Sequence, residues 1–239
     1  SGSMQLEIIV DTGIENGVQS PGLLKGLDAA QEELSSGVLG LEIPLGKSVA
    51  LTHVVKEINQ ALGDGTPADY RIPENRQLVA QELLLFENSG SDDLENLVDS
   101  QFSMTRVSLL LPYRDPVDYV PYMNRVIKLF QEKVGPEVEI WPSGFLSVMG
   151  STIDAVIRSM ARSYVLAVLI ITPLMVLLIG SLRMGLVSMV PNLVPILITL
   201  GIMGWTGIII DGFTLMIGGI ALGLAVDDTL HYMHNFRRY

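Results

Sequence analysis

Residues 163–182 read SYVLAVLIITPLMVLLIGSL, and no charged side chain interrupts this stretch between Arg162 and Arg183. A second uncharged stretch, residues 184–210, follows Arg183 and ends at Asp211. A helix needs about 20 apolar residues to cross the hydrocarbon core of a bilayer. Both stretches reach that length, which favours membrane-spanning helices over buried helices of a large soluble protein.

A third apolar stretch begins at Gly212 and contains two adjacent carboxylates, Asp227 and Asp228. The stretch before the pair is short for a full span, whereas a helix continuing to Phe236 is long enough. We therefore expect the pair to lie inside the span; the alternative is a shorter span that leaves the pair at the membrane surface. The predicted spans are residues 162–182, 184–208 and 212–236.

Three prolines, Pro173, Pro191 and Pro195, interrupt these apolar stretches. Proline removes a backbone donor and kinks a helix, and spanning helices tolerate it where neighbouring helices satisfy the freed carbonyl groups. Asn192 lies between two of the prolines, and its amide would be unsatisfied in contact with lipid. The pattern predicts an all-α bundle of three helices, with bends near Pro173 and Pro191.

Charge divides the chain into two parts. Residues 1–157 hold 23 Asp and Glu against 10 Lys and Arg, a net charge of −13, whereas residues 158–239 hold 3 against 5, a net charge of +2; the two sum to −11. We interpret them as a water-facing domain and a transmembrane region. The acidic balance argues against nucleic-acid binding, and the absence of cysteine excludes disulfides and thiolate metal sites.

The acidic pair is the candidate functional site. A charged group deep in a span costs several kcal/mol and is usually functional. Gly219 and Gly223 precede Asp227 at intervals of four residues, which predicts a close helix–helix contact on that side. Burial and the neighbouring like charge would favour the neutral form of one carboxyl, as a proton relay requires. His231 lies one turn beyond Asp227, either as a relay group or at the membrane interface; no third ligand suggests a metal site.

The first 157 residues alternate strand-like and helix-like patterns. Pro21 begins one amphipathic helix, Ser48 is expected to cap another, and Pro116 begins a third. This order predicts an α+β domain with split βαβ, ferredoxin-like packing, large enough to bury a core. The expected strands are 6–12, 38–45, 104–114 and 137–144, and the expected helices are 21–37, 49–62, 74–87 and 115–135.

Residues 145–163 have an amphipathic pattern with two readings. The segment is either a plain connecting helix or an interfacial helix that feeds lipophilic substrate to the spans. Residues 40–48 resemble a phosphate-binding loop but have five residues between the glycines, one too many. We therefore expect no nucleotide and no other cofactor.

Residues 220–238, IALGLAVDDTLHYMHNFRR, resemble the fourth span of the resistance–nodulation–division (RND) transporter superfamily, and residues 190–217 resemble its third span and short outer loop. Within that superfamily the likeness is to bacterial exporters related to the mycobacterial large membrane proteins (MMPL) and Patched, with a membrane region like a sterol-sensing domain (SSD). The resemblance implies a ferredoxin-like porter domain and proton-carrying aspartates at Asp227 and Asp228. In many relatives the second acid is Tyr, so Asp227 is the safer assignment.

The resemblance also implies a larger protein. Members have two repeats of six spans with a large outer domain in each, and here only spans resembling the second, third and fourth are found. We therefore expect a fragment of the first repeat, whose partners include the remainder of its own chain: the first span and the second repeat. The sequence leaves a homo-oligomer open.

The leading expectation is efflux: a secondary transporter, driven by the proton-motive force through proton antiport, that exports hydrophobic or amphiphilic molecules such as lipids. One alternative is a sterol- or lipid-sensing receptor of related fold, which would not need the two acids. A remote alternative is an intramembrane aspartyl protease, which needs aspartates on different spans. No enzyme activity is expected.

Arginines bear on the orientation of the spans. Arg183, Arg237 and Arg238 lie at one end of the predicted spans, and Arg158 and Arg162 lie at the other. The positive-inside rule slightly favours the Arg183 side as cytoplasmic. The expected location is the bacterial inner membrane, with the acidic domain on the extracytoplasmic side.

Overall fold

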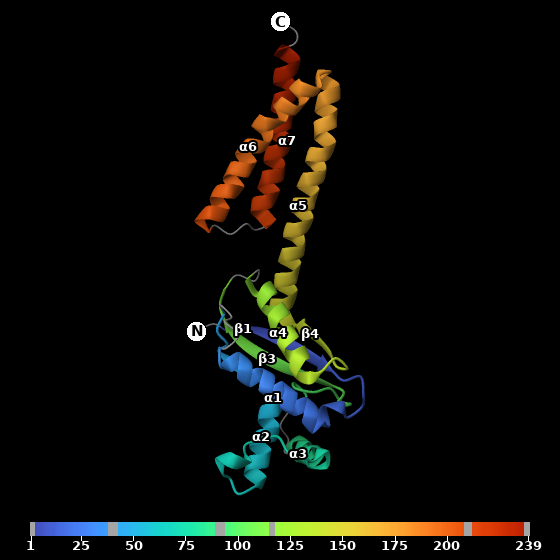
Figure 1. The fold of residues 1–239 in the computed structure, drawn as a ribbon, viewed down its shortest axis with the longest axis vertical. Coiled ribbons are helices and arrows are strands. Elements are labelled where there is room, and N and C mark those ends of the chain that lie inside the picture. Colours follow the sequence, from blue (N-terminus) through green and yellow to red (C-terminus); the bar gives the residue numbers. More distant parts are fainter. Residues whose placement is uncertain (1–2, 38–42, 89–93, 115–117, 208–211, 237–239) are drawn as a thin grey trace. The chain divides into compact units, whose positions relative to one another are not determined.

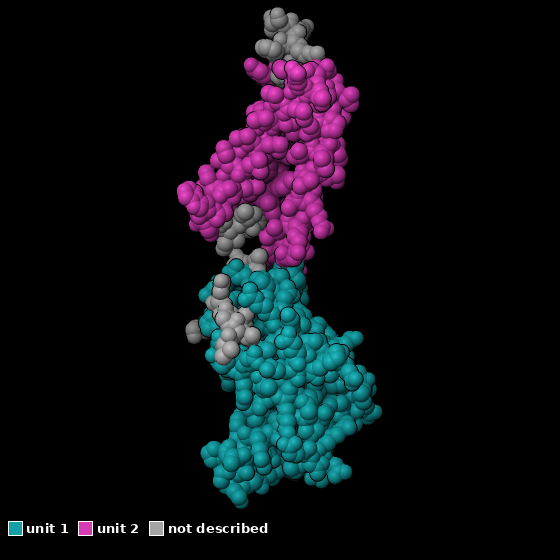
Figure 2. Space-filling view, in the orientation of Figure 1, with its two compact units in different colours: residues 1–151 teal, residues 152–239 magenta. Residues whose placement is uncertain are grey.

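The computed structural model describes residues 3–37, 43–88, 94–114, 118–207 and 212–236. The chain divides into two compact units, unit 1 (residues 1–151) and unit 2 (residues 152–239), and each is described by itself (Figure 2). The boundary expected from charge, at residue 157, falls a few residues beyond this division and inside one helix.

Unit 1 contains a four-stranded sheet with the order β2-β3-β1-β4. Its strands are β1 (Ser3–Asp11), β2 (Lys47–Val49), β3 (Met104–Pro112) and β4 (Glu139–Ser143). Each neighbouring pair is antiparallel. Side chains alternate along β1, so Leu6, Ile8 and Val10 are fully buried while Gln5 is exposed. The sheet therefore presents one apolar face to the helices.

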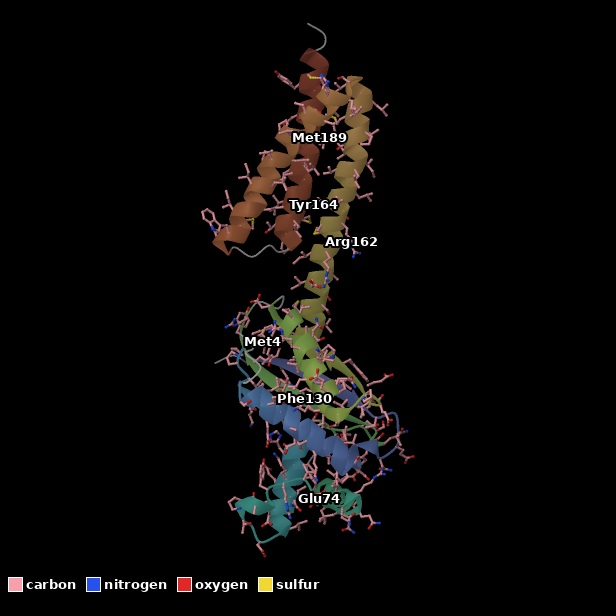
Figure 3. The ribbon with its side chains drawn as sticks, viewed as in Figure 1. Met4, Glu74, Phe130, Arg162, Tyr164 and Met189 are labelled. Atoms are coloured by element: carbon pink, nitrogen blue, oxygen red, sulfur yellow. The ribbon has the colours of Figure 1, made fainter. Side chains whose placement is uncertain are left out.

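Helices α1 (Pro21–Ser35) and α4 (Tyr119–Val134) pack side by side over the sheet (Figure 1). Their backbones come close at Gly26, where a Cβ atom would lie 2.7 Å from the carbonyl oxygen of Lys133. Phe130 of α4 is fully buried and belongs to the same apolar cluster as Leu24 of α1 (Figure 3). These contacts give unit 1 a continuous core.

Helices α2 (Leu51–Leu62) and α3 (Arg76–Asn88) lie between β2 and β3 in the chain. A polar contact attaches α2 to α1: the ammonium group of Lys56 lies 2.6 Å from Asp28 Oδ1 and 4.8 Å from the centre of the Tyr70 ring. Next to it, Gln31 Nε2 donates to Thr52 Oγ1 at 2.9 Å. Because these groups are mostly buried, the contact fixes how α2 sits on α1.

The strands expected at 6–12, 104–114 and 137–144 are confirmed as β1, β3 and β4. The expectation for Ser48 is wrong: it lies in β2, paired with Leu109, and α2 begins after Ala50 without a side-chain cap. The strand expected at 38–45 lies largely outside the described residues, as does Pro116; α4 is described from Tyr119. Ladder pairing with β3 prevails over the local capping preference of a serine.

Unit 2 contains α6 (Leu182–Thr206), α7 (Gly212–Phe236) and most of α5 (Gly144–Ile179). All three helices are long and apolar enough to cross a membrane. Gly180, at a φ of 66°, ends α5, and Gly207, at a φ of 71°, caps α6. Residues 145–163 are helical, as expected, and run without a break into the first predicted span: α5 is continuous over 36 residues, about 54 Å at 1.5 Å per residue.

Candidate functional site

Helix α7 carries both acids and packs along one face. Leu215 and Leu222 are buried, and Val226 and Leu230 pack against a cluster made by Met175, Ile179 and Met189 of α5 and α6 (Met189 is labelled in Figure 3). Successive positions in this set are seven, four and four residues apart, as expected for one face of a helix. The rest of α7 is left for other neighbours.

Asp227 and Asp228 lie off this packed face, and both are exposed in unit 2. The Asp227 side chain is 68 % exposed, and its Oδ1 lies 3.7 Å from Nε2 of His231, one turn further along α7. Within unit 2, neither acid therefore points into the contacts that α7 makes with α5 and α6. The physical reason is angular: successive helix positions differ by 100°, and the packed face centres on positions other than 227 and 228.

The two glycines of α7 differ in their surroundings. A Cβ atom on Gly219 would lie 3.2 Å from the ring of Tyr164 on α5 (Figure 3), so Gly219 allows this close contact. A Cβ atom on Gly223 would meet nothing within 4 Å among the described residues. The predicted helix contact is thus found at Gly219, whereas Gly223 shares the uncovered side of α7 with Asp227.

A polar contact between α6 and α7 lies directly beside the acids. Thr229 Oγ1 donates to Asn192 Oδ1 at 2.6 Å, and Asn192 is only 2 % exposed. The sequence predicted that Asn192 faces other helices, and this is confirmed. Thr229 was missed, because a threonine in an apolar span ordinarily bonds to its own helix and gives no signal of its partner.

An apolar groove of about 310 Å³ lies among the three helices of unit 2. Tyr164 of α5, labelled in Figure 3, lines one side, and Gly218 of α7 lines another. From α6 the groove is lined by Pro195, Ile196, Thr199 and Leu200. Such a groove suits a hydrocarbon chain or a ring system better than a polar ligand.

Unit 1 holds a buried carboxyl that the sequence did not single out. Glu82 of α3 is fully buried, and neither carboxyl oxygen has a hydrogen-bond partner among the described residues. Burial raises the pKa of Glu82 to about 7. A signal existed: Glu82 lies on the helix face of the buried Val79 and Leu83, but glutamate on a surface helix is usually placed in solvent.

The described residues contain no group of three or more His, Asp and Glu side chains that could hold a metal ion. Among the histidines, burial lowers the pKa of His53 in α2, and the nearby Lys56 charge lowers it further. The side chain of His234 lies outside the described residues.

Comparisons with protein-family models, with curated proteins and with solved structures find no match to this chain. The argument for function therefore depends on the residues and their geometry. The arrangement brings together the carboxyls of Asp227 and Asp228 and the imidazole of His231, which lies within 4 Å of Asp227. The next residue, Thr229, makes the hydrogen bond to the buried amide of Asn192. These groups can bind and release protons and can change hydrogen-bond partners.

Proposed function

We propose that this chain is part of a proton-driven secondary transporter and that Asp227 and Asp228 bind the transported protons. The supporting observation is the acidic pair on a helix of membrane-spanning length, with His231 3.7 Å from Asp227. A charge at the centre of a span costs about 3 kcal/mol on insertion scales. A helix that retains two adjacent carboxyls despite this cost is best explained by a use for their protonation.

The proposal requires that something polar or wet covers the uncovered side of α7. Asp227 and Asp228 are exposed there, and a Cβ atom on Gly223 would meet no described residue of unit 2 within 4 Å. In hydrocarbon these carboxyls would be unsatisfied. We propose that further spans of the same protein, such as the second repeat that the RND resemblance implies, pack on this side and line a water path to the acids.

Coupling follows if the acids are exposed to water in one conformation and covered in another. The free energy of protonation then differs between the two conformations, so proton binding shifts the population between them. His231, one turn from Asp227, would pass protons between the pair and the end of α7. Substrate movement would be tied to the same conformational change.

We also propose that unit 1 is a ferredoxin-like porter domain. Its strand order β4-β1-β3-β2, with α1 between β1 and β2 and α4 between β3 and β4, supports the split βαβ arrangement. Helices α2 and α3 would then be an insertion. By the positive-inside rule, Arg183 at the start of α6 favours a cytoplasmic position for that end of the spans, which would put unit 1 outside the bacterial inner membrane.

The substrate class would be hydrophobic or amphiphilic. The groove among α5, α6 and α7 supports this, because its lining is apolar and it lies on helices that lipid would surround. The same groove favours a second candidate function, a lipid- or sterol-sensing receptor. A sensor would bind lipid in the groove and would need no proton movement through Asp227.

The test is substrate efflux from proteoliposomes that contain the full-length protein under an imposed pH gradient. Asp227→Asn keeps the shape of the side chain but cannot exchange a proton, so export should be abolished with insertion nearly normal; Asp227→Glu should retain partial export. Asp64→Asn, a change at an exposed carboxyl of unit 1, is the control. Full export by Asp227→Asn, Asp228→Asn and the double variant would refute the proposal, and lipid binding without proton movement would favour the sensor.

A further inference from the structure

The contact between Asn192 and Thr229 differs from the hydrogen bonds of three other threonines in the spans. Thr172, Thr199 and Thr206 each donate to the carbonyl oxygen four residues earlier in their own helix, at 2.7 to 2.8 Å. Such a bond satisfies a hydroxyl group in an apolar surrounding without any neighbour. Thr229 instead donates across to Asn192 on α6 at 2.6 Å. The contact therefore links two helices.

This link helps to set the rotation of α7 about its own axis next to the two acids, and so the direction in which Asp227 and Asp228 point. Thr229 is the residue after Asp228, so the setting that turns Thr229 toward α6 turns both acids away from it. Asp228 lies 100° around the helix from Thr229 and about 1.5 Å along it. A rotation of α7 by about 100°, the angle between successive helix residues, would bring the carboxyl of Asp228 to Asn192.

The amide of Asn192 is only half satisfied in the present setting. Its oxygen accepts from Thr229, but its nitrogen, a donor of two hydrogen bonds, is buried without a partner among the described residues. Leaving a buried donor unpaired costs about 1–3 kcal/mol. The site thus has a vacant donor beside a helix that carries two acceptors.

Few other charged groups compete for this donor in the described part of unit 2. The ionisable side chains in the described part of unit 2 are Asp154, Arg158, Arg162 and Tyr164 of α5, Arg183 of α6 and, on α7, Asp227, Asp228, His231 and Tyr232. Asp154 and Arg158 pair with each other. Tyr164 lies against Gly219, ten residues or about 15 Å before Thr229. Arg183 is exposed and lies nine residues before Asn192. Asp228 is the acceptor next to the contact.

We propose that Asn192 is a positioning residue for Asp228, an inference that rests on the proposed proton coupling. In the setting described here, Asn192 accepts from Thr229 and Asp228 faces away. In the alternate setting, α7 turns, the Thr229 hydroxyl leaves, and Asn192 Nδ2 donates to the ionised carboxylate of Asp228. Protonation of Asp228 weakens this second bond, because an ionised acceptor forms the stronger hydrogen bond. The exchange of partners therefore joins the charge of Asp228 to the rotation of α7.

The test is the pH profile of export by the full-length protein in proteoliposomes. Asn192→Leu is similar in size but cannot donate, so ionised Asp228 loses its partner and the pH of half-maximal export should rise by about one unit. Thr229→Val, which keeps the shape but removes the competing hydroxyl, should move the profile the opposite way. Thr229→Ser keeps the hydroxyl and should restore the wild-type profile.

An unchanged profile in Asn192→Leu would overturn the inference. If Asn192→Leu fails to insert, the comparison of Thr229→Val with Thr229→Ser decides it, since identical profiles for these two variants would also overturn it. The two proposals fail separately. Export that survives in the Asp227→Asn, Asp228→Asn double variant refutes proton coupling, whereas lost export there together with a wild-type profile in Asn192→Leu refutes only the role of Asn192.

Discussion

Unit 1 and unit 2 treat their apolar side chains in opposite ways. In unit 1, large side chains such as Phe130 and Ile8 are fully buried in one cluster, whereas in unit 2 Leu177 is 76 % exposed and Trp205 is 90 % exposed. Each unit also holds carboxyls where they are not expected. Unit 1, expected in water, buries Glu82, and unit 2, expected in lipid, exposes Asp227 and Asp228. An exposed side chain can be interpreted only once it is known whether water or lipid surrounds it. The carboxyls found in the unfavourable surroundings are therefore the best candidates for functional residues.

The largest effect should come from removing a core ring of unit 1. Phe130→Ala deletes a fully buried side chain and should lower the free energy of unfolding by about 3–5 kcal/mol. Phe145→Ala is the matched control, because Phe145 is 69 % exposed and should cost less than about 0.5 kcal/mol. Urea unfolding of a fragment of residues 1–151 measures both, and equal losses would contradict an autonomous core in unit 1.

The buried carboxyl of unit 1 should make its stability depend on pH. The pKa of Glu82 rises from 4.5 to about 7 in the folded chain, so between these values the folded state binds more protons than the unfolded state. Its free energy of unfolding should therefore fall as pH rises, by at most about 1.4 kcal/mol per pH unit, and level off above pH 7. Glu82→Gln should remove this slope.

Urea midpoints of the wild-type and Glu82→Gln fragments, taken from pH 5 to pH 8, provide the measurement. Asp99 supplies a control, because its pKa is shifted in the opposite direction to that of Glu82. Burial raises the pKa of Asp99, but hydrogen bonds from the backbone of Met104 and from the Ser103 hydroxyl lower it more, and the net shift is downward. Asp99→Asn should therefore leave the slope between pH 5 and pH 7 unchanged. Parallel slopes in wild type and Glu82→Gln would show that the pKa of Glu82 is not raised in the folded chain.

A smaller effect is expected at the helix contacts of unit 2. A Cβ atom on Gly185 of α6 would lie 2.7 Å from the Cα of Val176 on α5, so Gly185→Ala forces the helices apart and should cost about 1–3 kcal/mol. Gly201, also on α6, has open space around it among the described residues. Gly201→Ala should be neutral or slightly stabilising. Unfolding in mixed detergent micelles compares them, and equal behaviour would deny a specific α5–α6 contact.

Much of the fold could be predicted because long apolar stretches and alternating strands are local signals. The first two spans could be predicted because Arg183 is the only charged residue between Arg162 and Asp211. Strands β1 and β3 could be predicted from their strand-like apolar patterns. Ser48 failed because β2 is three residues long and exists through its pairing with β3. The continuity of α5 was missed because the amphipathic pattern of residues 145–163 changes to a fully apolar one at residue 163, although no proline separates the two parts.

The residues of the candidate site could be predicted from the sequence, but the direction in which their side chains point could not. Adjacent acids in a span were evident from the sequence, yet which side of α7 they occupy depends on packing with α5 and α6. The partners Asn192 and Thr229 are 37 residues apart, and no local pattern joins them. Glu82 was missed for a related reason, since its burial is created by neighbours from other parts of unit 1.

The most direct test of the account asks which solvent touches unit 2. The chain contains no cysteine, so single cysteines can be introduced and labelled with a membrane-impermeant maleimide in native membranes. Tyr113→Cys, at a 79 % exposed position of unit 1, should label readily. Leu177→Cys and Leu197→Cys, at positions 76 % and 64 % exposed on α5 and α6, should label only after denaturation. Labelling of these two in intact membranes at the rate of Tyr113→Cys would contradict the account.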